Sequence, residues 1–537
     1  MAFDKRDEIL VLPFFGQGHL FPFYELIKHF NSLNFATTIF IPSTLASTIP
    51  SWLHNHGFIR IVYIPSSAHP FPTPPGPGQC GSKHYEELLH GVESFLLAQP
   101  LKPLCVVIDI MMGWAKDVFK KFEIPMVTLF TSGACSAAME YGSWKAHVSD
   151  LKPNEARILP GLPCEMAVSY SDLIRQAHQT PLPPPPPFNG PHSGLEDRGY
   201  RGPPNARHPL YFPSPPSDGP NSGLEEKEYR GPPKAHHPIP PPSPLFNRSH
   251  SGLQEKGYKG PPNAHQQPPW INDLEGISCI MMNTCHELEG QFLDYLTNQI
   301  RKPIWAVGPL LPEEYWKPIS LPVLDQDIRA NKQSNHTEQE VIQWLDSKPF
   351  GSVLYISFGS EVGPTKDEYA ELASALEESD WPFIWVIQHG YYQDDLETKV
   401  GEKGLIIAGW APQLMILRHP SIGAFLSHCG WNSTLEAIRR GVPILAWPIR
   451  GDQHYNAKLI VSYLKVGYMI RDDASLFQHD IVKKFDVVKG VGMIMNDQQT
   501  KQRAKVLRVI FSSGLPASSK VTLSAFRSLF VDKDKFP

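Results

Sequence analysis

The sequence has few of the features that mark membrane, secreted or nucleic-acid-binding proteins. No apolar run approaches the roughly 18 residues of a membrane helix, and the start, MAFDKRDE, carries no signal-peptide pattern. The seven cysteines are scattered without CxxC spacing, so neither a disulfide framework nor a structural metal is expected. Basic residues number 49 against 54 acidic ones, for a formal charge of −5, and no basic stripe indicates a nucleic-acid partner. We expect a cytoplasmic protein.

Short apolar runs alternate with helical patterns along most of the 537 residues, which suffice for two domains with full cores. This alternation predicts an α/β fold with two doubly wound, Rossmann-like domains. The predicted strands lie at 8–12, 37–41, 105–109 and 126–130 in the first domain, and at 353–358, 383–388, 405–408, 422–427 and 443–447 in the second.

The stretch from Trp410 to Gln453 is the most unusual part of the sequence. It reads WAPQLMILRHPSIGAFLSHCGWNSTLEAIRRGVPILAWPIRGDQ. A buried strand leads through the turn SHCGWNS into a helix that Gly441 ends. Such a strand–turn–helix aims backbone N–H groups and a helix dipole at one point, where a diphosphate binds well. Glu436, one turn from Asn432 on the same face, is suited to ribose hydroxyls.

This 44-residue stretch resembles the donor-binding signature of plant family-1 UDP-sugar glycosyltransferases. The resemblance implies the fold called GT-B and transfer of a sugar from UDP-glucose, a co-substrate, to a small acceptor, with no metal and no other cofactor. It also implies donor-binding roles along the signature. These fall on Trp410, Ala411 and Gln413 for uracil, His428, Asn432 and Ser433 for the phosphates, Glu436 for ribose, and Asp452 and Gln453 for the sugar hydroxyls. Gly430 is a further donor-binding residue, and Trp431 with Gln453 indicates a glucose-type sugar. Read without the family, Trp410, His428 and Trp431 could each be core residues.

Near the N-terminus, an apolar strand and Gly16-Gln17-Gly18-His19 precede a helix predicted from about Leu20 to Phe30. This is the first unit of a Rossmann-like domain. The family carries its catalytic base at this position, so the resemblance assigns that role to His19. An imidazole with a pKa near neutrality suits removal of a proton from an alcohol or phenol. Without the C-terminal signature, a histidine of a surface loop would be the favoured interpretation.

A histidine base needs an acid to orient it. Cys105 to Asp109 is an apolar run that ends in a carboxylate. The resemblance makes Asp109 the partner of His19, while the alternative is a helix N-cap. It further places Thr131, after the strand at 126–130, at the donor sugar, and Ser360, after the strand at 353–358, at the diphosphate.

The middle of the chain departs from the family. Residues 181–269 hold 25 of the 55 prolines. Within them a 29-residue unit recurs, marked by Tyr200, Tyr229 and Tyr258. Being rich in proline and charge and poor in aliphatic residues, the units cannot bury a core, so we interpret them as a disordered or polyproline-II-like insertion.

The insertion supports a rival hypothesis, because its PxxP-type spacing suits SH3- or WW-like domains. The protein would then be a Pro-rich scaffold whose enzyme core is inert, or a catalytically inert UDP-sugar-binding protein. A neutral repeat expansion or a gene-model error would also explain the insertion. The predicted organisation is an acceptor-binding domain at 1–308, a linker at 309–340, and a UDP-sugar-binding domain at 341–537 whose last helix packs back on the first.

Overall fold

The structure, a computed structural model, describes residues 7–66, 83–177, 267–316, 333–387, 401–478 and 480–531. All of these belong to one compact unit. Nearly all of the Pro-rich insertion at 181–269, and positions 317–332 of the predicted linker, lie outside the described residues. The interpretation of the insertion as disordered, and its docking to SH3- or WW-like domains, therefore stay predictions.

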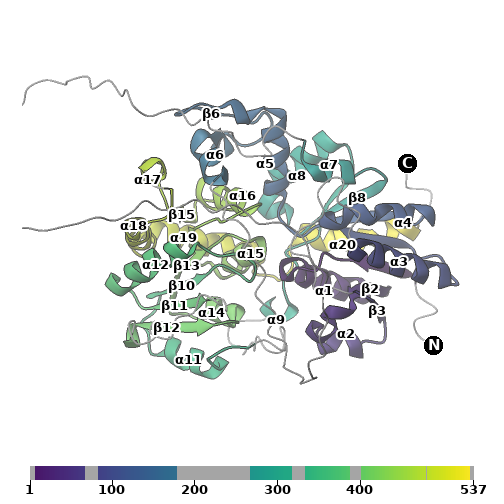
Figure 1. Ribbon diagram of the computed structural model, residues 1–537, viewed down its shortest axis with the longest axis horizontal. Helices are drawn as coiled ribbons and strands as arrows, with labels where there is room; N and C mark the ends of the chain where they lie inside the picture. Colours follow the sequence, from purple (N-terminus) through teal and green to yellow (C-terminus); the bar gives the residue numbers. More distant parts are fainter. Residues whose placement is uncertain are drawn as a thin grey trace, which may run out of the picture. The chain divides into compact units, whose positions relative to one another are not determined.

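The first half of the described chain forms a parallel sheet in the strand order β3-β2-β1-β4-β5-β8-β9 (Figure 1). Because the chain adds strands first on one side of β1 and then on the other, the sheet is doubly wound. Its strands are β1 (Glu8–Leu12), β2 (Ala36–Pro42), β3 (Ile59–Ile64), β4 (Cys105–Asp109), β5 (Met126–Phe130), β8 (Ile277–Met282) and β9 (Ile304–Ala306). Its helices include α1 (Gln17–Ser32), α2 (Ser51–Asn55), α3 (Lys83–Ala98), α4 (Lys116–Lys121), α5 (Ala134–Lys145), α7 (Pro269–Asp273) and α8 (His286–Ile300).

The second half forms another parallel sheet, in the order β12-β11-β10-β13-β14-β15. In this sheet the chain adds strands first on one side of β10 and then on the other. The strands are β10 (Val353–Ser357), β11 (Phe383–Ile387), β12 (Gly404–Ala408), β13 (Ile422–Ser427), β14 (Ile444–Ala446) and β15 (Gly467–Met469). The helices are α9 (Glu313–Trp316), α11 (Glu338–Asp346), α12 (Lys366–Glu378), α14 (Gln413–Arg418), α15 (Trp431–Arg440), α16 (Gln453–Lys458), α17 (Asp473–Gln478), α18 (Lys484–Asn496) and α19 (Gln498–Leu507). The predicted α/β class with two Rossmann-like, doubly wound sheets is confirmed.

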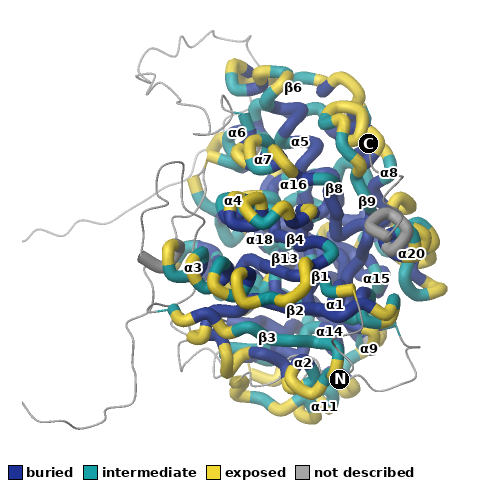
Figure 2. The backbone as a smooth tube through the Cα atoms, turned by 90° about the vertical axis from the view of Figure 1, so that its right-hand side faces the viewer, coloured by how far each residue is buried: buried dark blue, intermediate teal, exposed yellow. Residues whose placement is uncertain are grey.

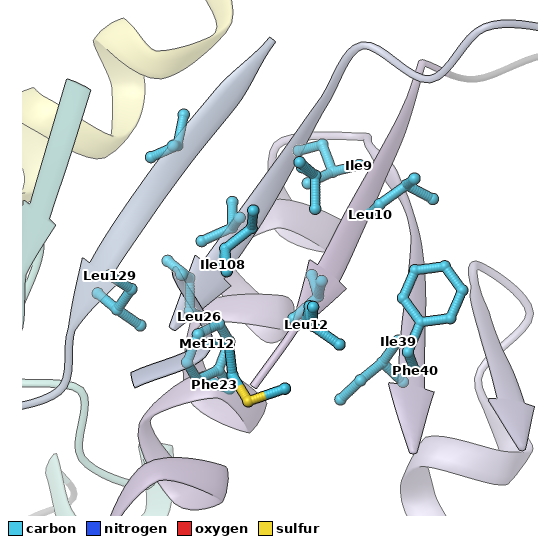
Figure 3. Close-up of a cluster of buried hydrophobic side chains, with 14 of the residues drawn as sticks. Ile9, Leu10, Leu12, Phe23, Leu26, Ile39, Phe40, Ile108, Met112 and Leu129 are labelled. Atoms are coloured by element: carbon cyan, nitrogen blue, oxygen red, sulfur yellow. The ribbon is translucent and has the colours of Figure 1, made fainter. Parts of the chain in front are cut away.

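The strands form the interior of each half. Figure 2 shows most of them buried, with exposed backbone concentrated on the surrounding helices and loops. In the first core, side chains of β1, β2, β4, β5 and α1 meet, among them the fully buried Leu10, Phe23 and Phe40 (Figure 3). Both faces of these parallel strands are covered, which explains why they are continuously apolar rather than alternating.

Helix α1 begins earlier than predicted. The expected start was near Leu20, but Gly16, with extended backbone, is the N-cap and Gln17 the first helical residue. The Gly16 carbonyl accepts the backbone N–H groups of His19 and Leu20, both at 3.0 Å. His19 therefore lies in the first turn of a helix rather than in a loop, and its backbone position is set by α1.

The last described helix, α20 (Ala517–Val531), packs on the first sheet. Phe526 is fully buried, with its ring centroid 4.9 Å from that of Phe30 and 6.1 Å from that of Trp305. In Figure 1 this yellow helix lies among the purple and blue elements of the first half. In the parts of the chain that are described, no helix combines the length and apolarity needed to cross a membrane.

Candidate active site

The carboxyl ends of β1 and β4 meet at the switch point of the first sheet, where ligands of doubly wound folds bind. The two strands are adjacent, with Leu12 opposite Ile108. The loop after β1 leads to His19 in the first turn of α1, and β4 itself ends in Asp109. His19 Nδ1 lies 2.8 Å from Asp109 Oδ2. The fold thus brings together two side chains that are 90 positions apart in the sequence.

Asp109 has both of the roles that the sequence left open: it is the partner of His19 and also a helix N-cap. Its side chain is fully buried. While Oδ2 faces His19, Oδ1 accepts the backbone N–H of Met111 at 2.9 Å and caps the short 3₁₀ helix Ile110–Ala115. The cap holds the carboxylate in one orientation, so the partner of His19 is itself fixed.

Thr131 follows β5, the next strand of the sheet. Its hydroxyl lies 2.9 Å from His19 Nδ1. A carboxylate only accepts hydrogen bonds, so we assign the ring proton to Nδ1, which faces Asp109. The Nε2 lone pair is then available to accept a proton.

Several carboxylates act on the charge of His19. Burial of the ring opposes its protonated form, but the Asp109 carboxylate outweighs this by Coulombic attraction and its hydrogen bond, with smaller contributions from Glu361 and Asp452. The pKa of His19 is therefore raised above its usual value near 6.5. The arrangement stabilises the imidazolium that forms when His19 takes up a proton.

The second sheet has its own switch point, between β10 and β13, where Ser357 lies opposite Ser427. Ser360 follows β10 and is exposed, and His428 follows β13. Burial lowers the pKa of His428 to about 4, against a smaller opposing effect of a hydrogen bond with the Ser357 backbone. His428 is thus a neutral hydrogen-bonding group at neutral pH. Gly359 makes room for it: its φ is 77°, and a Cβ there would lie 2.8 Å from His428 Nε2.

A hydrogen-bond network joins three of the predicted donor-binding residues. Gln413 Nε2 donates to Ser433 Oγ at 3.0 Å and to Glu436 Oε2 at 2.7 Å. Gln413 Oε1 accepts the hydroxyl of Tyr355 at 3.0 Å. Tyr355 was missed in the sequence because it is one of several apolar residues of β10. The network fixes the Glu436 carboxylate, which belongs to α15.

Trp410 and Ala411 follow β12 at the same edge of the second sheet. Ala411 is buried, whereas Trp410 is partly exposed. The Trp410 ring meets the edge of Phe21, which belongs to α1, with 6.5 Å between ring centroids. An aromatic side chain of the first half thus lies beside the residue predicted to stack on uracil.

Asp452 and Gln453 lie at the start of α16. Gln453 Oε1 accepts the backbone N–H groups of Ile449 and Arg450, at 2.9 and 3.0 Å, and Asp452 Oδ2 accepts Asn456 Nδ2 at 3.0 Å. Burial raises the pKa of Asp452, while His19 lowers it. The pair is therefore held in place by α16 and lies within electrostatic reach of His19.

Glu361 is a further member of the site that the sequence analysis missed. It pairs with Arg450 at 3.1 Å. It also approaches the glycine loop of the first half so closely that a Cβ on Gly16 would lie 2.6 Å from Glu361 Oε1. In the sequence, its position directly after Gly359-Ser360 could have identified it as a candidate site residue.

Two residues of the signature connect the halves. Asn432 Nδ2 donates to the carbonyl of Gly18 at 2.8 Å, next to His19. Trp431 is buried, and its ring N–H donates to the carbonyl of Asn283, at the end of β8, at 2.7 Å. Trp431 was expected beside the sugar, and also as a core residue; the structure places it in the packed core between the sheets. Gly430 is the N-cap of α15.

No three histidine, cysteine or acidic side chains gather into a metal-ion site among the residues described. The groups that face the two switch points are hydrogen-bond donors, carboxylates and the His19 ring.

The chain is similar to several known proteins. Residues 287–512 match the family described as UDP-glucoronosyl and UDP-glucosyl transferase. UDP-glycosyltransferase 73B4 of Arabidopsis thaliana is 36% identical over 235 residues, 42% of this chain and 47% of that protein. UDP-glucosyl transferase 73M2 of Saponaria officinalis is 27% identical over 493 residues, 87% of this chain and 84% of that protein. The chain spans about half the length of most of the curated relatives it matches first.

Among solved structures, UGT73P12 of Glycyrrhiza uralensis shares the fold with a TM-score of 0.67. The two chains are 23% identical, and the match covers 98% of this chain and 96% of the other.

Proposed function

This chain is a member of the plant family-1 UDP-glycosyltransferases, and we propose that it transfers glucose from UDP-glucose to a hydroxyl group of a small hydrophobic plant metabolite. The observation that carries this proposal is the hydrogen bond from Asn432 to the Gly18 carbonyl. It joins the donor-binding signature of the second sheet directly to the turn that holds His19 against Asp109. The proposed base, His19, and the proposed nucleotide-sugar site thus belong to one active site.

In the proposed mechanism, His19 is the general base. Nε2 takes the proton of the acceptor hydroxyl while the acceptor oxygen attacks the anomeric carbon from the face opposite UDP. The new carbon–oxygen bond forms as the bond from the anomeric carbon to the diphosphate breaks, which inverts the configuration. Asp109 keeps the ring in the required tautomer and stabilises the imidazolium. Holding both substrates between the sheets supplies the favourable orientation.

The donor would be bound by the second sheet. We assign the ribose to Glu436, fixed by Gln413, and the uracil to Trp410 and Ala411. The diphosphate would be met by His428, Ser433, Ser360 and the backbone N–H groups at the start of α15, whose helix dipole favours an anion. Asp452 and Gln453 would hold the sugar hydroxyls, close to His19 and Thr131.

The acceptor class is inferred from relatives. Similar proteins bear the names scopoletin glucosyltransferase, anthocyanin 3'-O-beta-glucosyltransferase and cis-zeatin O-glucosyltransferase. A phenolic, terpenoid or hormone hydroxyl is therefore the proposed target. The cytoplasmic location expected from the sequence stays a prediction.

Incubation of the purified protein with UDP-glucose and a mixed panel of flavonoid, coumarin, terpenoid and cytokinin acceptors tests the proposal. We expect a product heavier than one acceptor by one hexose, detected by mass spectrometry, with release of UDP. Calorimetric titration with UDP is the control. A protein that binds neither UDP nor UDP-glucose would contradict the proposed function and favour the scaffold hypothesis.

A further inference from the structure

Helix α6 (Tyr170–Ala177) belongs to the first half of the chain, yet its charged side chains bind elements of the second. Asp172 accepts a hydrogen bond from Lys458 Nζ, on α16, at 2.7 Å. Arg175 donates to Asp473 Oδ1, on α17, at 2.7 Å. Beside them, the ring of Tyr170 stacks on another α17 side chain. We call Asp172, Arg175, Lys458 and Asp473 the α6 clamp.

The Asp172–Lys458 pair is largely removed from solvent. The two side chains are 15% and 13% exposed. Asp172 also accepts the backbone N–H and the hydroxyl of Ser169, both at 2.9 Å. Burial opposes the charged carboxylate, but Lys458, these hydrogen bonds and Arg175 outweigh it, so the pKa of Asp172 is lowered. A buried pair of this kind tolerates loss of one partner poorly, because the other charge stays buried and unpaired.

The pair lies where the short helix α16 continues into the π-helical turn Leu459–Tyr463, and the other end of α16 is the proposed sugar site. Helix α16 runs from Gln453 to Lys458, with Asp452 as its N-cap residue. Its six residues span only about 9 Å at 1.5 Å per residue. Asn456 of the same helix is hydrogen-bonded to Asp452 and to the carbonyl of Cys429. We therefore expect a shift at Lys458 to move Asp452 and Gln453.

Tyr455 of α16 also contacts the first half, where its carbonyl accepts Cys135 Sγ at 3.9 Å, but it carries no positive charge. The lining shared by α6 and α16 also includes His454 and Tyr455. Burial lowers the pKa of His454 to about 4, so its ring is neutral at neutral pH. Among the described residues of α16, Lys458 is accordingly the cationic side chain that contacts the first half.

We propose that Asp172 is a positioning residue for the donor sugar: through Lys458 it fixes α16, and with it Asp452 and Gln453, relative to His19. This inference rests on the proposed function, because it assumes that Asp452 and Gln453 bind the sugar. In this proposal α6 controls how the sugar is presented to His19. It does so indirectly, because the clamp residues of α6 bind Lys458 and Asp473 rather than Asp452 or Gln453.

The test compares the affinities for UDP-glucose and for UDP by calorimetry. UDP lacks the sugar and would be bound by Trp410, Glu436 and the diphosphate site. In Lys458→Met we expect the Kd for UDP-glucose to rise about tenfold while that for UDP changes less than about twofold. Lys458→Arg, which keeps the charge, should restore most of the UDP-glucose affinity. The double variant Asp172→Asn with Lys458→Met should lose less than Lys458→Met alone, because no buried charge is left unpaired.

Lys489→Met is the matched control, since it removes a lysine whose ion pair with Asp472 is about half exposed and should change neither affinity. Equal loss of UDP and UDP-glucose affinity in Lys458→Met would mean a general structural role, and unchanged UDP-glucose affinity would mean no role; either overturns the inference. Because binding is measured without an acceptor, a wild-type protein that binds UDP-glucose but transfers no sugar would contradict the proposed function and still test the clamp.

Discussion

At the scale of single residues, the proposed chemistry depends on the environment of His19. A histidine with a raised pKa stays protonated, and therefore unable to act as a base, up to a higher pH than an ordinary one. Activity should consequently rise with pH and level off only above the raised pKa of His19. The Asp109 carboxylate is the main cause that raises this pKa, whereas burial of the ring acts in the opposite direction.

Replacement of Asp109 by Asn should move this pH dependence. With the carboxylate gone, burial dominates, so the midpoint of the acid limb of kcat/KM should shift to lower pH. The plateau should fall by about 10²-fold or more, because the imidazolium loses its partner. The measurement is a pH profile of kcat/KM, with Asp117→Asn, an exposed aspartate of α4, as control. An unmoved midpoint would show that Asp109 does not set the pKa of the base.

Sequence motifs located His19, Asp109 and the signature residues because each follows a buried strand that ends at the same edge of its sheet. The residues that contact them were harder to predict from the sequence. The contact of Thr131 with His19, the approach of Glu361 to Gly16 and the hydrogen bond of Trp431 to Asn283 join residues more than 100 positions apart. Such contacts depend on how two sheets pack, which no local pattern encodes.

At the scale of elements, α20 holds the end of the chain on the first sheet through Phe526. Its ring is fully buried against Phe30, Phe35 and Trp305. Phe526→Ala should lower the free energy of unfolding by about 3–5 kcal/mol, from lost burial and the cavity left behind. Denaturant unfolding followed by circular dichroism measures the effect. Val521→Ala, on the same helix but 69% exposed, should change stability by less than about 0.5 kcal/mol; equal effects would contradict the role of Phe526.

The predicted strands were largely correct because buried parallel strands are continuous apolar runs; β4, β5 and β13 have the expected bounds. The strands that were missed gave weaker patterns. β9 and β15 are only three residues long, and β3 is an edge strand that is mostly only partly buried. β8 reads ISCIMM, with few β-branched residues, and comes shortly after the Pro-rich insertion.

At the scale of the whole molecule, the proposed site is formed where the two sheets meet. The first sheet supplies His19 and Asp109, the second supplies the signature, and Asn432, Trp431 and the α6 clamp join them. Alternating strands and helices were enough to predict two doubly wound sheets. The contacts that orient one sheet on the other were beyond sequence reasoning, since they involve backbone carbonyls such as those of Gly18 and Asn283.

The most direct test of this shared site is His19→Ala, assayed for glucoside formation and for UDP binding on the same preparation. We predict that the rate falls by about 10²–10⁴-fold, while the Kd for UDP stays within about threefold of the wild-type value. His90→Ala, at an exposed histidine of α3, should leave both unchanged. A His19→Ala variant that keeps most of the wild-type rate would contradict the assignment of His19 as the base, and with it the mechanism proposed for the whole molecule.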